Sequence, residues 1–260
     1  MRFMELSKNY KVLVRYDGSR YGGWQKQTKS PATIQGKIEA VLEKMCGCPI
    51  EIAGSGRTDA GVHANGQVFH FKAAVSLQPD EIQNYLNRYL PEDIAVLSVE
   101  TAPERFHSRL SAKGKRYVYR IWRSEIPPVF ERKYVCNLRK LMPEEKEILP
   151  NVAAMKTAAK LLLGTHDFKG FTSLKKTKKS TVRTITALLI EERGPEIVIT
   201  FEGDGFLYHM IRIIVGTLLE VGFGKRSAQS ISQVLENGIR EQAGFLAPPE
   251  GLCLDAVYYE

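Results

Sequence analysis

The sequence predicts an α+β protein with two similar halves. Two observations indicate this class. Runs of alternating apolar residues, typical of strands, are interspersed with apolar residues at helical spacing, and a similar order of elements occurs twice along the chain. The chain has 260 residues, of which 43% are hydrophobic and 25% charged, as in an ordinary soluble globular protein. This length suits two medium-sized domains, which we expect at residues 1–108 and 109–260.

The first half alternates strands and helices in a defined order. Residues 11–16 alternate between polar and apolar side chains and end at the turn-forming pair Asp17 and Gly18, which predicts a strand. Apolar residues recur at helical spacing across residues 33–46, and Gly47 ends that helix. The remaining elements are strands at 50–53, 67–73 and 94–100 and a helix at 80–90. The order β-α-β-β-α-β is that of the split β-α-β, or ferredoxin-like, domain.

A second round of similar elements follows. The predicted strands are residues 116–122, 182–192, 196–202 and 254–259. The predicted helices are residues 152–163, 207–221 and 228–236, with Gly164 stopping the first and Ser227 as the N-cap of the last. Residues 127–150 contain four prolines and are expected to form an irregular insertion. The sequence therefore predicts two ferredoxin-like halves with mainly antiparallel sheets.

The positive charge of the chain is concentrated in two segments. The formal net charge is +8. Residues 105–123 hold seven basic and no acidic residues, and residues 169–183 hold six basic and no acidic residues, with aromatic side chains interleaved. Such segments suit a nucleic-acid-binding surface, although two solvated basic segments would have the same pattern. The candidate RNA-binding residues are Arg109, Lys113, Lys115, Arg116, Lys175, Lys176, Lys178 and Lys179.

The apolar and cysteine patterns exclude further classes. No window approaches the roughly 20 apolar residues of a membrane-spanning helix, and the N-terminus lacks the apolar run of a secretory signal. We therefore expect a cytoplasmic protein with no membrane partner. The four cysteines are Cys46, Cys48, Cys136 and Cys253. The first two are too close for the usual Cys-x-x-Cys metal site, so we expect reduced thiols and no metal.

The glycine-rich segment 54–63 is the most informative stretch for chemistry. Three glycines let its backbone approach a ligand closely, and it holds one cation, Arg57, and one carboxylate, Asp59. It lacks the Gly-Lys-Ser/Thr ending of a phosphate-binding loop and the glycine spacing of a dinucleotide-binding loop. On residue types alone, the simpler interpretation is a tight turn in which Asp59 caps a backbone N–H group and pairs with Arg57.

Five motifs overturn that simpler interpretation. Gly-Arg-Thr-Asp-Ala-Gly-Val-His-Ala, residues 56–64, resembles the active-site motif of the tRNA pseudouridine synthase A family. Four other segments match the family in the same order. They are Tyr-Asp-Gly…Gly-Trp-Gln at 16–25, Lys-Arg-Tyr-Val-Tyr at 115–119, Phe-x-x-x-Met-Ile-Arg at 206–212 and Ala-Pro-Pro-Glu-Gly-Leu at 247–252. Together these motifs extend the resemblance over nearly the whole chain.

This resemblance implies a fold, an activity and partners. The implied fold is the pseudouridine synthase fold, in which the sheets of the two halves join around a central active-site cleft. The implied activity is that of an isomerase without a cofactor, which breaks the N-glycosidic bond of uridine in tRNA, turns the base and rejoins it through C5. The family acts at positions 38, 39 and 40 of the anticodon stem-loop, on a flipped-out uridine. It is also homodimeric, so we expect tRNA and a second copy as partners.

The resemblance also assigns roles to five residues. Asp59 aligns with the catalytic nucleophile, and Arg57 is placed to keep Asp59 ionised or to bind a phosphate. Tyr117 aligns with the tyrosine that stacks on the target base, and Leu252 with an apolar residue of the uracil pocket. Arg212 aligns with an active-site arginine, for which Asp59 is the obvious partner. Without the resemblance, Arg212 at a helix edge would be the simpler interpretation, and Leu252 would suit the core as well as a pocket.

Two other classes of function stay open at this stage. A catalytically silent RNA-binding protein could share the fold, but binding alone does not require a carboxylate that faces phosphate. A metal-dependent nuclease would need several clustered carboxylate ligands, and segment 54–63 offers one. We expect His63 and His209 to be structural or to contact RNA, and Asp204 to serve a turn.

Overall fold

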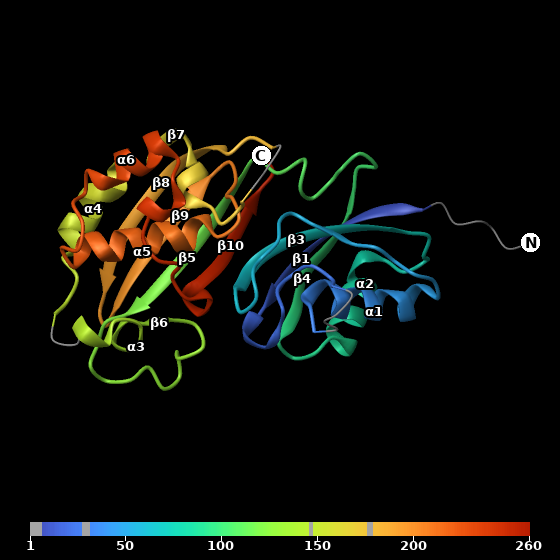
Figure 1. Ribbon diagram of the computed structural model, residues 1–260. Coiled ribbons are helices and arrows are strands. Elements are labelled where there is room, and N and C mark those ends of the chain that lie inside the picture. The colour runs from blue at the N-terminus through green and yellow to red at the C-terminus, as the bar shows by residue number, and fades with distance from the viewer. Residues whose placement is uncertain (1–6, 28–31, 146–147, 176–178) are drawn as a thin grey trace, which may run out of the picture. The chain divides into compact units, whose positions relative to one another are not determined.

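The computed structural model describes residues 7–27, 32–145, 148–175 and 179–260 (Figure 1). The chain divides into two compact units. The first consists of Met1–Lys113 with Cys253–Glu260, and the second of Gly114–Leu252. These bounds differ from the expected 1–108 and 109–260 because the final strand packs with the first unit. Within the described ranges, no helix is long and apolar enough to cross a membrane.

The first unit is built on an antiparallel sheet. Its strands are β1 (Lys8–Tyr16), β2 (Ala53–Gly54), β3 (His63–Ala73) and β4 (Ile94–Ala102). Strand β1 lies between β3 and β4 and is antiparallel to both, and β2 pairs with the far edge of β3. The order β4-β1-β3-β2 is that of a ferredoxin-like sheet. Strand β10 (Leu252–Tyr258) joins the same unit through a parallel pairing of Cys253 with His63.

Two helices accompany this sheet, α1 (Ile34–Cys46) and α2 (Pro79–Tyr89) (Figure 1). The side chain of Thr33 caps α1 at its start, and Gly47 ends it with a φ of 69°. Both helices bury an apolar stripe, and α2 packs against β4. The predicted helical spacing and stop residue of α1 are confirmed, and Thr33, which was predicted to be its first residue, is its N-cap.

The second unit repeats the pairing pattern with a second set of antiparallel strands. Its strands pair in the order β5 (Gly114–Trp122), β9 (Glu196–Gly203), β8 (Val182–Arg193) and β7 (Gly164–Asp167). Strand β6 (Cys136–Asn137) runs parallel to the end of β5. In the first unit, β1 pairs with β3, and β3 also pairs with β2. In the second unit, β5 pairs with β9, and β9 also pairs with β8. The predicted α+β class, with two similar, mainly antiparallel halves, is confirmed.

Helix α5 (Met210–Gly222) is the central helix of the second unit. All of its residues except Glu220 are buried, and it packs against α4 (Val152–Lys160). The other helices of the unit are α3 (Leu138–Leu141) and α6 (Ser230–Asn237). Short 3₁₀ turns occur at Gly18–Arg20 in the first unit and at Pro143–Glu145, Phe168–Phe171, Arg240–Gln242 and Pro249–Gly251 in the second.

Some predicted boundaries were wrong. The strand expected at 50–53 is reduced to Ala53–Gly54, because the N–H and C=O groups of Ile52 bind the side chains of Glu39 and Gln35 instead of a strand. Helix α5 begins at Met210 rather than 207, because His209 has a left-handed backbone with a φ of 64°.

Two further boundaries differ near the ends of helices. Ser227 is not the N-cap of α6, since it accepts the first hydrogen bond of a preceding turn and the helix begins at Ser230. Helix α4 ends at Lys160 with Leu161 as its C-cap, so Gly164 does not stop it and the predicted end at 163 was wrong. Gly164 has another position in the fold. It starts β7, an edge strand that the sequence did not predict, and the insertion at 127–150 contains β6 and α3.

The close approach at Gly216 provides a test of this packing. Alanine is normally about 1 kcal/mol better than glycine inside a helix. At position 216, however, an added Cβ would lie 2.0 Å from the carbonyl oxygen of Phe245. We therefore expect Gly216→Ala to lower the free energy of unfolding by about 1–3 kcal/mol, measured by urea denaturation. A variant as stable as wild type would contradict the packing of α5 against the 243–247 segment.

Candidate active site

The loop that carries Asp59 connects β2 to β3 and lies against the segment that follows β1. The N–H of Trp24 donates to the carbonyl of Thr58 over 3.0 Å, and the N–H of Gly61 donates to the carbonyl of Tyr21 over 3.3 Å. Within the loop, the N–H of Val62 donates to the carbonyl of Asp59 over 3.2 Å and closes a turn. Backbone contacts from outside the loop therefore fix residues on both sides of Asp59.

Glycine is required where these two segments meet. Gly23 has a φ of 94°, and a Cβ there would lie 2.6 Å from the carbonyl oxygen of Thr58. A Cβ on Gly18 would lie 2.0 Å from the carbonyl oxygen of Val62, and one on Gly54 would lie 2.7 Å from the Trp24 ring. The motifs at residues 16–25 and 56–64 thus pack directly against each other.

Buried polar side chains hold the loop from the sheet side. The hydroxyl of Tyr16 on β1 lies 2.8 Å from the hydroxyl of Thr58. Gln67 on β3 is fully buried, accepts from the Ser55 hydroxyl over 2.7 Å and donates to the carbonyl of Gly56 over 3.1 Å. Because each buried group is satisfied by its partner, the loop has one favoured conformation.

Arg57 and Asp59 differ in their surroundings. Asp59 is half-buried, whereas Arg57 is exposed. The Nε of Arg57 donates to Oε1 of Gln25 over 2.8 Å. The predicted role of Arg57 toward Asp59 or a phosphate remains a prediction, but the structure gives Arg57 a defined anchor that the sequence did not suggest.

His63 is buried behind the loop, as the structural alternative expected. Its Nδ1 accepts from the N–H of Gly18 over 3.1 Å and lies 3.3 Å from Oδ1 of Asp17. A ring nitrogen that accepts a backbone hydrogen bond holds the loop to the turn after β1. This contact explains why the histidine ends the glycine-rich motif.

In the second unit, Tyr117 lies on the buried face of β5. It is 8% exposed and meets Phe206 edge to face at a centroid distance of 5.4 Å. Tyr119 and Ile121 share this face, so the predicted alternation along the strand is confirmed. The hydroxyl of Tyr119 donates to the carbonyl of Pro248 over 2.8 Å, which fits the core role expected for it.

One loop, residues 247–252, contacts Arg212 at its start and has Leu252 at its end. Arg212 is 8% exposed, so it is not an edge arginine with its head in water. Its Nε donates to the carbonyl of Ala247 over 2.7 Å, and the Ala247 N–H donates back to the carbonyl of Arg212 over 3.1 Å. Gly251 lies against Tyr119 and Arg120, and the buried Leu252 follows it. The motifs at residues 206–212 and 247–252 therefore also pack directly against each other.

The basic strand β5 has acidic neighbours that the sequence pattern concealed. Arg116 pairs with Glu202 at 2.6 Å, Arg120 pairs with Glu196 at 2.5 Å, and Arg123 pairs with Glu192. All three glutamates come from β8 and β9, far away in the sequence. An acid-free run in sequence is therefore not an acid-free surface in the fold.

The other candidate RNA-binding residues are more open. Arg109, Lys113, Lys175 and Lys179 are exposed, and Lys115 is partly exposed. Lys176 and Lys178 lie outside the described residues. Asp204 accepts from the N–H of Thr184 over 3.0 Å, a backbone contact at the β8–β9 pair. In the described part of the chain, no group of three or more His, Cys, Asp or Glu residues could hold a metal ion.

A family model described as tRNA pseudouridine synthase matches residues 12–110 and 158–260. The chain belongs to the tRNA pseudouridine synthase family. The resemblance based on the five motifs is thus confirmed, and family membership makes the protein an isomerase that converts uridine to pseudouridine in tRNA. Asp59, Arg57, Arg212 and Leu252 lie in the matched residues, whereas Tyr117 lies between the two matched ranges.

Relatives of the family match the chain over nearly its whole length. One is a tRNA pseudouridine synthase A from Bacillus sp. (strain KSM-64), 45% identical over 251 residues that cover 96% of this chain and 99% of the relative. Another, from Clostridium perfringens (strain 13 / Type A), is 44% identical and covers 97% and 100%. Likeness to solved structures is weaker. A Cbf5-Nop10-Gar1 complex matches with a TM-score of 0.34 and 12% identity, over 81% of this chain and 45% of that chain.

The buried hydroxyl of Tyr16 gives a testable pH dependence. Burial raises the pKa of this phenol well above its ordinary value, so it stays neutral in the folded protein. Above about pH 10 the unfolded chain loses this proton and the folded chain keeps it, so stability falls as the pH rises. Above about pH 10, the unfolding free energy of Tyr16→Phe should therefore decrease less steeply with pH than that of wild type, by about 1.4 kcal/mol per pH unit.

Urea denaturation at a series of pH values from neutral to alkaline would measure this slope. Tyr89→Phe, at a position 53% exposed, is the matched control and should leave the slope unchanged. An identical slope for wild type and Tyr16→Phe would contradict the neutral, buried state of the Tyr16 hydroxyl.

Proposed function

We propose that this protein forms pseudouridine at positions 38, 39 and 40 in the anticodon stem-loop of tRNA, with Asp59 as its nucleophile. The observation that carries the proposal is the fixed loop around Asp59, which presents one half-buried carboxylate within a segment matched by the family model. In this proposal the first unit supplies the catalytic aspartate and the second unit supplies Tyr117 and Arg212.

The reaction needs one carboxylate and no co-reactant. The bond between C1′ and N1 breaks, a bond between C1′ and C5 forms, C5 loses its proton and N1 gains one, so no electrons enter or leave. The Asp59 carboxylate can attack C1′, attack the base, or remove a sugar proton on a route through a glycal, and it is a good leaving group afterwards. Arg57 and Arg212 would keep Asp59 ionised and hold its orientation, since cations favour a charged carboxylate.

Two buried residues of the second unit suit recognition of the base. Tyr117 has its ring fixed by Phe206, so stacking a uracil on it would cost little side-chain entropy. Leu252 gives an apolar wall beside the loop that anchors Arg212. A paired uridine must leave its helix to reach such groups, at a cost of a few kcal/mol that backbone contacts to the RNA would offset.

Phosphate contacts would come from the exposed basic residues. We propose that Arg109, Lys113, Lys115, Lys175 and Lys179 contact the tRNA backbone, together with Lys176 and Lys178. Arg116 is a weaker candidate because Glu202 already binds it. Recognition through phosphates and shape fits an enzyme that acts at three neighbouring positions in different sequence contexts. The proposal includes a homodimer, from the resemblance, and a cytoplasmic location, where a tRNA substrate is met.

Release of tritium from tRNA labelled at C5 of uridine tests the activity directly. Tritium release without strand cleavage supports the isomerase. Strand cleavage would support the nuclease alternative, and binding without either would support a silent RNA-binding protein. Sequencing that detects pseudouridine in the product would show whether positions 38, 39 and 40 are the ones modified.

Removal of the Asp59 charge should abolish turnover. Asp59→Asn is nearly isosteric but cannot act as a nucleophile, so we expect kcat to fall by about a thousandfold or more, with tRNA affinity and melting temperature close to wild type. Asp204→Asn is the matched control, because its carboxylate contacts the backbone of Thr184, and it should retain activity. Activity of Asp59→Asn within about tenfold of wild type would refute the assignment.

The affinity for tRNA should depend steeply on salt. Each phosphate that the protein neutralises contributes about −0.7 to −0.9 to the slope of log K against log salt. Lys175→Ala should reduce this slope by about one unit and weaken all tRNA substrates alike, while kcat at saturation stays unchanged. Lys37→Ala, at an exposed position on α1, is the control. Equal slopes for wild type and Lys175→Ala, measured by filter binding, would remove Lys175 from the RNA surface.

A further inference from the structure

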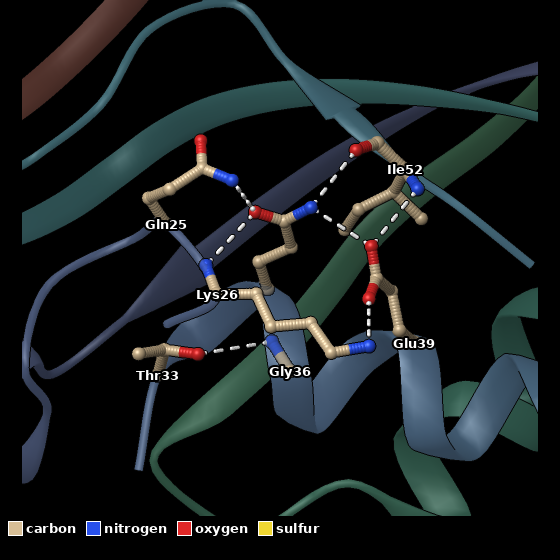
Figure 2. A network of polar contacts seen from close by, with 7 residues as sticks. Gln25, Lys26, Thr33, Gly36, Glu39 and Ile52 are labelled. Carbon is tan, nitrogen blue, oxygen red and sulfur yellow. Dashed lines mark hydrogen bonds and ion pairs between the residues drawn. The ribbon is translucent and has the colours of Figure 1, made fainter. Parts of the chain in front are cut away.

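A chain of polar side chains leads from the interior of the first unit to Arg57. Figure 2 shows the part of this chain from Glu39 to Gln25. Its members are Glu39 and Gln35 on α1 and Gln25 in the segment before it, none of which has a role in the proposed reaction. Glu39 and Gln35 are 5% and 9% exposed, on a helix that otherwise buries isoleucine, leucine and valine. Buried polar side chains are costly unless they are paired, so their arrangement calls for an explanation.

The chain begins at a carboxylate that can only accept hydrogen bonds. Oε1 of Glu39 accepts from Nε2 of Gln35 over 2.8 Å and from the N–H of Ile52 over 3.2 Å. Oε2 of Glu39 binds Nζ of Lys26 at 2.9 Å. The buried charge is thus compensated by one cation and two N–H groups, which fixes the direction of every bond that starts from it.

The contact with Glu39 fixes the orientation of the Gln35 side-chain amide. Its Nε2 donates to Glu39 and to the carbonyl of Ile52 over 3.2 Å, while its Oε1 accepts from the N–H of Lys26 over 3.0 Å and from Nε2 of Gln25 over 2.8 Å. Rotating the amide by half a turn would place an oxygen against two oxygens and an NH₂ group against two donors. All four contacts are satisfied in one orientation only.

Gln25 therefore has its orientation set before Arg57 is reached. Since Nε2 of Gln25 is committed to Gln35, its Oε1 is available as an acceptor, and it accepts from Nε of Arg57 over 2.8 Å. An arginine is a donor only, so the opposite orientation of Gln25 would repel it. With Nε held, the planar guanidinium still carries four N–H donors on its Nη atoms in a fixed plane.

We propose that Gln25 is a positioning residue for pseudouridine formation, and that Glu39 and Gln35 fix it so that Arg57 presents its guanidinium in one orientation two residues before Asp59. This proposal rests on the proposed function in so far as Arg57 assists Asp59. An exposed arginine on a glycine-rich loop loses much conformational entropy when it is ordered. The polar chain orders the Arg57 side chain before substrate binds, so this entropy cost does not add to the activation free energy of the reaction.

A double-mutant cycle tests whether Gln25 acts through Arg57. Misplacement of a catalytic group costs up to about a hundredfold, so we expect Gln25→Ala and Gln35→Met each to lower kcat by about ten- to a hundredfold with little change in KM. In an Arg57→Ala background, neither substitution should lower kcat further. Additive effects on kcat, or an Arg57→Ala variant with wild-type kcat, would overturn the proposal.

Thr33→Ala separates positioning from helix stability. Thr33 caps the same helix through its contact with the N–H of Gly36 over 3.2 Å, but it is not part of the polar chain (Figure 2). The substitution should lower the melting temperature, as should Gln35→Met, and should leave kcat at its wild-type value. A loss of kcat in Thr33→Ala that matches Gln35→Met at equal loss of stability would show a merely structural role.

A second measurement does not depend on activity. The Nε–H of Arg57 should give a slowly exchanging signal in a ¹⁵N NMR spectrum of the wild-type protein. That signal should exchange at least about fivefold faster in Gln25→Ala and Gln35→Met, and at the wild-type rate in Thr33→Ala, since exchange follows loss of the hydrogen bond. Unchanged exchange in Gln35→Met would refute the polar chain even if tritium release confirms the enzyme. A wild-type protein without tritium release would refute the proposed function alone.

Discussion

The contact between the segment after β1 and the Asp59 loop is the constraint on which the rest of the first unit depends. A Cβ on Gly18, Gly23 or Gly54 would clash with an atom of the facing segment. The two segments therefore pack in direct contact at these positions. Close packing of this kind leaves few alternative conformations. The sheet order, the buried Tyr16 and Gln67, and the turn at His63 all support one placement of a single carboxylate.

The second unit also holds a candidate site residue in one position, but it does so with a buried helix and a loop. Its key residue, Arg212, lies in the first turn of a helix that is buried on nearly every side, and the backbone of Ala247 in the 247–252 loop binds it. Burial of a guanidinium is expensive, so its donors must be met by fixed acceptors. A loop that satisfies Arg212 also sets Tyr119 and Leu252, which is why the corresponding motifs occur together.

Local patterns in the sequence predicted most of the elements. Strands β8 and β9 and helices α1 and α2 follow from periodicity, caps and stop residues that act within one turn or one strand. Some misses are local, such as the left-handed backbone of His209 before α5, but others depend on partners that are distant in sequence. Ile52 left its strand for the side chains of Gln35 and Glu39, and the arginines of β5 found glutamates on other strands.

The candidate site was predictable to a different degree. Residue types alone left Asp59 in an ordinary turn, and only the order of five motifs indicated a nucleophile. Gln25 stood inside one of those motifs without a role, since nothing local shows which oxygen or nitrogen of an amide faces its neighbour. That information is contained in the hydrogen-bond partners, which the fold alone brings together.

The position of β10 has a consequence for how the protein is made. This strand belongs to the first unit and pairs with the start of β3, where a Cβ on Gly66 would lie 2.4 Å from the carbonyl oxygen of Asp255. During synthesis, β3 therefore leaves the ribosome long before its last partner does. Until then that end of β3 is an open strand edge, the kind of surface at which chains aggregate. The unit that carries Asp59 is thus completed last, although it is translated first, and a prematurely ended chain would lack the strand that pairs with β3 at His63, where the Asp59 loop ends.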